Sequence, residues 1–277
     1  MTSKRQVARL VTGMPATDGA GVELVRVIGQ PQLMELDPFL LLDSFRSDDP
    51  DDYIAGFPPH PHRGFETVTY LLNGCMRHKD NAGNEGVIEP GGIQWMTAGR
   101  GIVHSEMPEQ QDGLLEGFQL WINLPASHKM TTPGYQEHGS DDIPVETRPG
   151  ARIRVLTGRT SLGTEGPVTQ PLTDPLYLDV SLDADTGFEE SVPAGHNAFV
   201  YGINGTIHIG DNAFGRDQLA VLGAGDSVSL ASGDDGARFL LIAGKPLNEP
   251  IVRAGPFVMN TREELHQAYH DYQTGRF

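Results

Sequence analysis

The sequence is poor in several features that would assign it to a familiar class of protein. Its 277 residues include a single cysteine, Cys75, so an intrachain disulfide cannot form. We interpret Cys75 as a small packed or turn residue rather than as a redox-sensing thiol. No apolar run approaches the ~18 residues of a membrane-spanning helix, and the first residues lack the apolar segment of a signal peptide. These absences predict a soluble, cytoplasmic protein.

Positive charge is also scarce. Lys and Arg total 20 against 37 Asp and Glu, which gives a formal net charge of −17. A surface of this sign repels the phosphates of nucleic acids and anionic lipid headgroups. The composition therefore predicts no direct contact with nucleic acid or membrane, although it would suit a basic protein partner.

Turn-forming residues, by contrast, are abundant. The chain has 34 Gly, 20 Pro and 38% hydrophobic residues, which is typical of a packed core of short strands joined by turns. Thr67–Leu72 alternates as a strand does and ends at Asn73-Gly74, a strong hairpin signal. Gly117–Leu124 alternates in the same way. The sequence therefore predicts an all-β fold.

One helix is predicted, at the end of the chain. Thr261–Glu264 fits a capping box, in which the Thr hydroxyl and the Glu carboxylate bind free amide groups of the first turn. Apolar residues then recur at helical spacing at Leu265, Ala268, Tyr269 and Tyr272. We expect this helix to pack on the β core.

A degenerate repeat divides the chain into two similar units. Tyr70–Gly74 aligns with Tyr201–Gly205 at an offset of 131, and Gly91–Gly99 aligns with Gly225–Gly233 at an offset of 134. Pro125–Gly150, rich in Pro, Gly and charge, is interpreted as the connection. We predict an N-terminal unit at residues 1–134 and a C-terminal unit, with the helix, at residues 135–277.

Two short motifs carry the chemistry. His60-Pro61-His62 and His104-Ser105-Glu106 each place two metal-binding side chains at i and i+2. Side chains two apart on a strand point to the same face, so two adjacent strands would aim three imidazoles and one carboxylate at a single point. This set suits a divalent first-row metal and leaves room for water or substrate.

The repeat makes this prediction asymmetric. In the second unit, the alignment replaces the ligand-type residues with residues unsuited to a metal. The counterparts of His60, His62 and Glu66 are Ser191, Pro193 and Asn197, and those of His104 and Glu106 are Arg238 and Leu240. We therefore expect one unit to bind a metal and the other to be metal-free.

The motifs also resemble those of a known family. Gly56–Gly74 reads G-x3-H-x-H-x3-E-x7-G, which resembles the first motif of the cupin superfamily of small β-barrels. Phe57–Val68, Gln94–Glu106 and Gly255–Thr261 resemble the pirin family more specifically, over nearly the whole chain. The resemblance implies two tandem cupin barrels (a bicupin), of which only the N-terminal one holds a metal.

The resemblance also assigns residues. In pirins the ligands are the histidines of the HPH motif and the His and Glu of the H-x-E motif, here His60, His62, His104 and Glu106. The metal of the family is iron, although the donor set also admits Zn. Glu66 lies at an even spacing from His60 and His62, and we expect it behind the ligands, paired with Arg63 or Arg100.

Two functions are implied by the resemblance. The first is quercetin 2,3-dioxygenase activity, in which O2 cleaves a flavonol or similar enolisable aromatic with release of CO and Glu106 takes a proton as general base. The alternative is a non-catalytic, iron-dependent redox sensor that binds a transcription factor or metabolic enzyme. A metal-free structural bicupin is a third, weaker interpretation, because it leaves the ligand set unexplained. Since the tandem barrels already contact each other, we expect a monomer.

Overall fold

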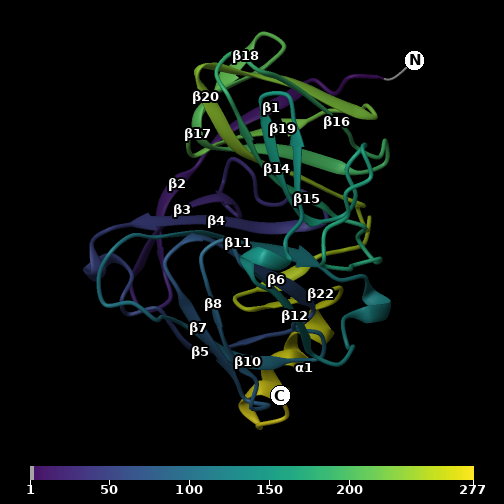
Figure 1. Cartoon of the computed structure of the whole chain (residues 1–277). Coiled ribbons are helices and arrows are strands. Elements are labelled where there is room, and N and C mark those ends of the chain that lie inside the picture. The colour runs from purple at the N-terminus through teal and green to yellow at the C-terminus, as the bar shows by residue number, and fades with distance from the viewer. Residues whose placement is uncertain (1–2) are drawn as a thin grey trace. The chain divides into compact units, whose positions relative to one another are not determined.

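The computed structural model describes residues 3–277, which form two compact units (Figure 1). The histidine unit, named for its cluster of three histidines, comprises residues 15–29, 39–140 and 247–277. The second unit comprises residues 3–14, 30–38 and 141–246. Both consist of antiparallel strands, and the chain ends in a helix, so the predicted all-β fold with a C-terminal helix is confirmed.

The N-terminal residues 3–14 belong to the second unit, and the C-terminal residues 247–277 belong to the histidine unit. The predicted boundaries, by contrast, divide the chain once, between residues 134 and 135. Strand β1 (Val7–Thr12) pairs with β19 (Gln218–Leu222) in the second unit. The last 31 residues, 247–277, belong to the histidine unit. There the Val258 amide donates a hydrogen bond to the Arg63 carbonyl (3.0 Å). Backbone pairing between distant segments thus decides which unit each terminus joins.

Two sheets build the histidine unit. One has seven strands in the order β12-β9-β6-β11-β4-β3-β2, and the other has four in the order β5-β10-β7-β8. The strands are β2 (Met14–Asp18), β3 (Val22–Ile28), β4 (Phe39–Ser47), β5 (Phe57–His62), β6 (Phe65–Asn73), β7 (Met76–Asp80), β8 (Glu85–Ile88), β9 (Ile93–Thr97), β10 (Ile102–Pro108), β11 (Leu115–Asn123) and β12 (Gly134–His138). Short 3₁₀ turns lie at Pro50–Asp52, Ala126–His128 and Ser140–Asp142, and a small ladder pairs β21 (Val252–Ala254) with β22 (Phe257–Met259).

The second unit is one nine-stranded sheet. Its main path runs β1-β19-β17-β20-β15-β14-β13, with β16 on β20 and β18 on β17. The remaining strands are β13 (Val145–Arg148), β14 (Ala151–Thr157), β15 (Leu176–Leu182), β16 (Gly187–Ser191), β17 (Asn197–Ile209), β18 (Asn212–Phe214) and β20 (Ser227–Gly244). Alternating Val, Leu, Ile and Phe side chains from these strands form its buried core.

The stretch Pro125–Gly150 is more than the predicted connection. It contains β12, which pairs with β9 at the edge of the seven-stranded sheet, and β13, which pairs with β14 in the second unit. Its Pro and Gly residues interrupt the alternation on which the sequence-based assignment depends. The sequence of this stretch therefore gave no indication that it contains two paired strands.

The terminal helix α1 (Arg262–Gln273) begins as predicted. Thr261 Oγ1 accepts a hydrogen bond from the Glu264 amide (3.1 Å), and the Glu264 carboxylate accepts one from the Thr261 amide (3.0 Å). Leu265 and Ala268 are buried against β21 and β22. Within residues 3–277, no helix is long and apolar enough to cross a membrane.

Strand pairing corrects the second half of the predicted repeat. Counting on from the aligned tyrosines, Met76 corresponds to Ile207. Met76 pairs with Pro108, which is 32 residues away, but Ile207 pairs with Ser232, only 25 residues away. The offset of 134 is therefore wrong, because the chain between these paired positions is shorter in the second unit.

The corrected repeat keeps the asymmetry but changes the residues. Counting back from those pairs, Val228 and Leu230 replace the predicted counterparts of His104 and Glu106, and both are buried apolar residues. Opposite Val228 lies Glu190, in the place that His60 holds opposite His104. Glu190 accepts a hydrogen bond from Arg148 (2.5 Å). These positions of the second unit thus hold an apolar pair and an ion pair.

Candidate metal centre

The HPH motif lies on β5, an edge strand of the four-stranded sheet. Pro58, Pro59 and Pro61 have no amide hydrogen, so they can be accommodated at an edge but not in the middle of a sheet. The register shifts by one residue between the pairs His104–His60 and Glu106–Phe57. The β10–β7 ladder is regular over the same residues, so the irregularity lies in the proline-rich strand.

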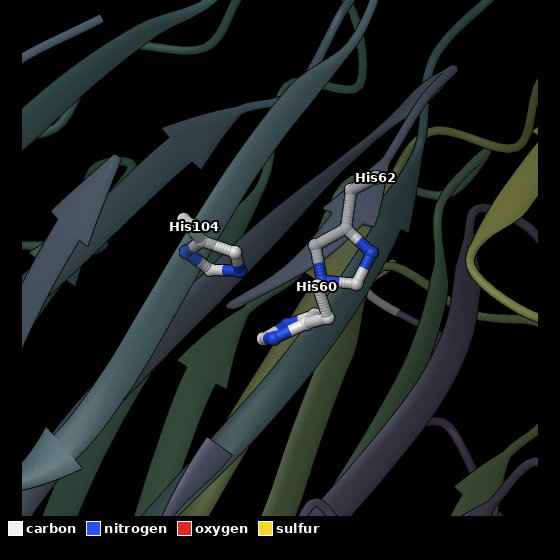
Figure 2. A group of neighbouring side chains, drawn as sticks. All are labelled: His60, His62 and His104. Carbon is white, nitrogen blue, oxygen red and sulfur yellow. The ribbon is translucent and has the colours of Figure 1, made fainter. Parts of the chain in front are cut away.

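The structure brings three of the predicted ligands together. His104 on β10 is directly opposite His60 on β5, and His62 is two residues further along β5. Their potential ligand nitrogens all lie within 4.8 Å of one another. Figure 2 shows the three imidazoles converging from the two strands. Period two within each strand and direct pairing between them produce this cluster, which contains three of the four side chains expected to meet there.

Burial favours the neutral form of two of the imidazoles, which is the form that binds a metal. The pKa of His104 is lowered to about 4, mainly by burial; His60 and His78 also lower it, whereas Glu106 and Asp80 act in the opposite direction. Burial is also the main reason why the pKa of His62 is well below its ordinary value. His60 Nδ1 lies 2.8 Å from the Pro58 carbonyl, which can only accept, so Nδ1 donates and Nε2 keeps its lone pair.

The Glu106 carboxylate is not among the potential ligand atoms that lie within 4.8 Å of one another. Glu106 is buried on the same face of β10 as His104, but its carboxylate is held by neutral donors from the seven-stranded sheet. Gln119 Nε2 donates to both carboxylate oxygens (3.1 and 3.0 Å), and Thr69 Oγ1 donates to one of them (2.8 Å). Although burial raises the pKa of Glu106, His104 and Gln119 are the largest of the opposing influences that bring the pKa below its usual value.

The structure places the three residues expected behind the ligands in different surroundings. Glu66 is buried on β6, in the other sheet, and accepts a hydrogen bond from Thr97 (2.6 Å). The even spacing from the histidines does not carry over to Glu66 because the chain turns at Gly64, whose φ is +88°. A Cβ there would collide with the Val258 carbonyl, so this turn requires glycine.

Arg63 faces the C-terminal helix. Its Nη1 donates to Asp271 (2.8 Å), its Nε donates to the Arg100 carbonyl (2.5 Å), and its guanidinium stacks on Phe277 at 4.3 Å. The Arg100 residue is itself exposed, and its backbone rather than its side chain makes this contact. Arg63 thus fixes the turn after His62 against α1.

A cavity of about 600 Å³ opens beside His60 and His62. Its walls are mainly apolar, and Trp121 meets the His62 ring edge to face at 5.1 Å. Arg253, from β21, lies 4.7 Å above the Trp121 ring. The polar residues of the lining include Gln119 and the ion-paired residues Asp18, Arg26 and Asp43. The volume is in the range of small-molecule sites.

Sequence reasoning missed a polar group behind the cluster. His78 is directly opposite Glu106 on β7, and its Nε2 lies 2.8 Å from Glu137 on β12. Gln94 donates to the same carboxylate (2.9 Å). The alternation of Met76, His78 and Asp80 would have marked His78 as inward-facing, but nothing local indicated the partner on β12.

Comparisons with known proteins agree with this architecture. The family model for pirin matches residues 21–122, and that for the pirin C-terminal cupin domain matches residues 177–277. The chain belongs to the pirin family. The two tandem cupin domains that the resemblance implies are thereby confirmed.

Similar proteins cover this pirin-family chain from end to end. A pirin-like protein of Caulobacter vibrioides is 54% identical, with 99% of each chain covered. A Pseudomonas aeruginosa protein named "Putative quercetin 2,3-dioxygenase" is 50% identical, with 99% of each chain covered. A crystal structure of quercetin 2,3-dioxygenase from Acinetobacter baumannii has a TM-score of 0.91 and 33% identity, again over 99% of each chain.

Proposed function

We propose that this chain binds iron through His60, His62, His104 and Glu106 and catalyses O2-dependent cleavage of a flavonol or similar enolisable aromatic. The observation that carries the proposal is the position of the imidazole cluster at the wall of a mainly apolar cavity of about 600 Å³. A planar aromatic ligand that occupies this cavity would lie next to a metal bound by the histidines. The names of two similar proteins, from P. aeruginosa and A. baumannii, support the same reaction.

The residues present fit a metal ion. Both ring nitrogens of His104 are buried, and residues 3–277 provide no hydrogen-bond partner for either. A buried polar atom without a partner is costly, and coordination to a metal removes that cost. His60 offers Nε2 as a second ligand, and Glu106 is the nearby carboxylate of the same strand. Nitrogen and oxygen donors of this kind suit iron, and zinc is the chemical alternative.

Iron held there would acidify a coordinated hydroxyl group and supply the redox chemistry that O2 requires. The protein would supply the base and the orientation. Glu106 would accept the proton of the substrate hydroxyl at a carboxylate oxygen, while hydrogen bonds from Gln119 and Thr69 hold the carboxylate in position. Trp121 and the other apolar walls would exclude water from the reacting ring. One O2 is consumed and one CO released for each ring cleaved.

The test compares iron-loaded protein with quercetin in the presence and absence of O2. We expect the flavonol absorbance band to disappear only when both metal and O2 are present, with CO released in equal amount. If the band persists under all conditions, while a protein partner is captured in one iron oxidation state only, the redox-sensor alternative replaces the enzymatic proposal.

A further inference from the structure

A row of polar side chains crosses the seven-stranded sheet from the metal centre into the cavity. Gln119 on β11 is directly opposite Thr69 on β6 on one side and Asp43 on β4 on the other. Asp43 is in turn opposite Arg26 on β3. Paired residues on antiparallel strands project from the same face. Gln119, Asp43 and Arg26 therefore line one cavity wall in succession, and all three contribute to its lining.

The spacing of the strands sets how far Asp43 and Arg26 lie from the histidine end of the cavity. Neighbouring strands are about 4.8 Å apart, so Asp43 lies roughly 5 Å and Arg26 roughly 10 Å beyond Gln119. Gln119 binds Glu106 and lines the cavity together with His60 and His62. A ligand that starts at the histidine cluster and follows the wall meets Asp43 and Arg26 with its far end.

The far end is polar and combines one guanidinium with two carboxylates. Arg26 donates from Nε to Asp43 Oδ1 (2.9 Å) and from Nη2 to Asp43 Oδ2 (2.6 Å) and Asp18 Oδ2 (2.7 Å). In the described part of the chain, no acceptor is hydrogen-bonded to Arg26 Nη1, so its two N–H groups remain available. The group thus offers carboxylate acceptors and guanidinium donors side by side.

The arrangement of Arg26, Asp43 and Asp18 favours one kind of ligand group. An anion would be repelled by the two carboxylates, and a cation would be repelled by the guanidinium. A hydroxyl group can donate a hydrogen bond to Asp43 and accept one from Arg26 at the same time. The surrounding walls are apolar, with Leu24, Leu41 and Phe45 beside the polar group. An aromatic ring that carries a hydroxyl group satisfies both surfaces.

We propose that Asp43 and Arg26 form a specificity subsite for a phenolic hydroxyl group on the part of the substrate remote from the histidine cluster. The substrate class is then a hydroxylated aromatic of at least two rings, with a metal-binding end and a phenolic far end. This inference rests on the proposed function for the role of the histidine cluster, but it concerns a separate part of the cavity.

The test uses two flavonols that share the same metal-binding end. Quercetin carries further hydroxyl groups on its outer rings, and 3-hydroxyflavone carries none. Binding to iron-loaded, full-length protein is measured by calorimetry without O2, so that no turnover occurs. We expect the wild-type protein to bind quercetin roughly tenfold more tightly, the effect of one hydrogen bond to a charged group.

The variants decide whether the subsite causes this preference. In Asp43→Asn the ratio of the two Kd values should fall below about twofold, whereas Asp112→Asn, an exposed control, should keep the wild-type ratio. Because Asp43 is buried and its variant could fold poorly, Asp18→Asn at the exposed rim should also reduce the ratio. Equal affinities in the wild-type protein, or an unchanged ratio in folded Asp43→Asn protein, would overturn the proposal.

Failure of the subsite and failure of the proposed function are distinguishable. If quercetin is cleaved but the Kd ratio does not respond to Asp43→Asn, the subsite is refuted and the enzymatic function stands. If the ratio responds as expected but no flavonol is consumed with O2, the subsite stands and the dioxygenase proposal is refuted.

Discussion

His104 lies directly opposite His60 across the β5–β10 ladder, with ring centroids 4.5 Å apart. This pairing makes the cluster a property of the sheet register rather than of a flexible loop. Sites built on paired strands keep their geometry better than sites on loops. The three imidazoles are therefore held in place by the strands themselves, and the residues around them should determine the reactivity of the site.

Gln119 should control the reactivity of Glu106. Replacing Gln119 with Leu removes the two hydrogen bonds to its buried carboxylate. We expect kcat for quercetin to fall by about 10- to 100-fold, with iron content near the wild-type value because the three imidazoles are untouched. Steady-state kinetics and metal analysis check this. Gln32→Leu, at an exposed position, is the control, and an unchanged kcat in Gln119→Leu would contradict the role.

The Arg63–Asp271 pair should contribute to stability by fixing α1 to the turn after His62. The side chains of Arg63 and Asp271 are only 3% and 14% exposed, so removing one charge leaves the other buried. We expect Asp271→Asn to lower the free energy of unfolding by about 2–3 kcal/mol. Urea denaturation measures this change. Glu263→Gln, exposed on the same helix, should change stability by less than about 0.5 kcal/mol, and equal effects of the two variants would argue against the pair.

Lys129 should be a second such anchor. Its buried ammonium group donates to the carbonyls of Gly64 (2.7 Å) and Val258 (3.0 Å) and to Asn123 Oδ1 (2.6 Å). Lys129→Met would leave three buried acceptors without their donor, and we expect a loss of about 3 kcal/mol. Thermal and urea unfolding test this. Lys79→Met, whose side chain is 65% exposed in the wild type, is the matched control; a Lys129→Met protein as stable as the control would refute the anchor.

The metal-free protein should lose stability on mild acidification. Because the folded-state pKa of His104 is lowered to about 4 from 6.5, the unfolded chain binds more protons between these values. The free energy of unfolding therefore falls as pH decreases from 6.5 toward 4, by up to about 3 kcal/mol from this group. Urea unfolding of His104→Gln should show a shallower dependence on pH. A parallel curve for His104→Gln, with exposed His128→Gln as reference, would exclude His104 as the cause.

The grouping of the three histidines could be predicted from the sequence because each motif lies within one strand. Period two holds from His60 to His62 and from His104 to Glu106, and it needs no knowledge of neighbouring strands. The same period wrongly placed Glu66 on the face of the histidines, because the chain turns at Gly64 and continues in the other sheet. Local alternation is informative only as far as the next turn.

The cavity could not be predicted in this way. Asp43 and Gln119 are neighbours only through the β4–β11 register, and Arg253 reaches Trp121 from the last segment of the chain. Register between distant strands depends on the packing of the whole unit, which no short window of sequence contains. The same limit explains the exchange of terminal segments and the wrong offset in the second half of the repeat.

Metal content of the His62→Ala protein tests the central claim most directly. Full-length wild type, His62→Ala and the exposed control His266→Ala would be loaded with Fe(II) without O2, freed of excess metal and analysed by atomic emission. We predict about one iron per chain in the wild type and control, and less than about a tenth of that in His62→Ala, since loss of one of a few ligands removes most of the affinity. Equal iron content in all three proteins would contradict the assignment of the histidine cluster as the metal centre.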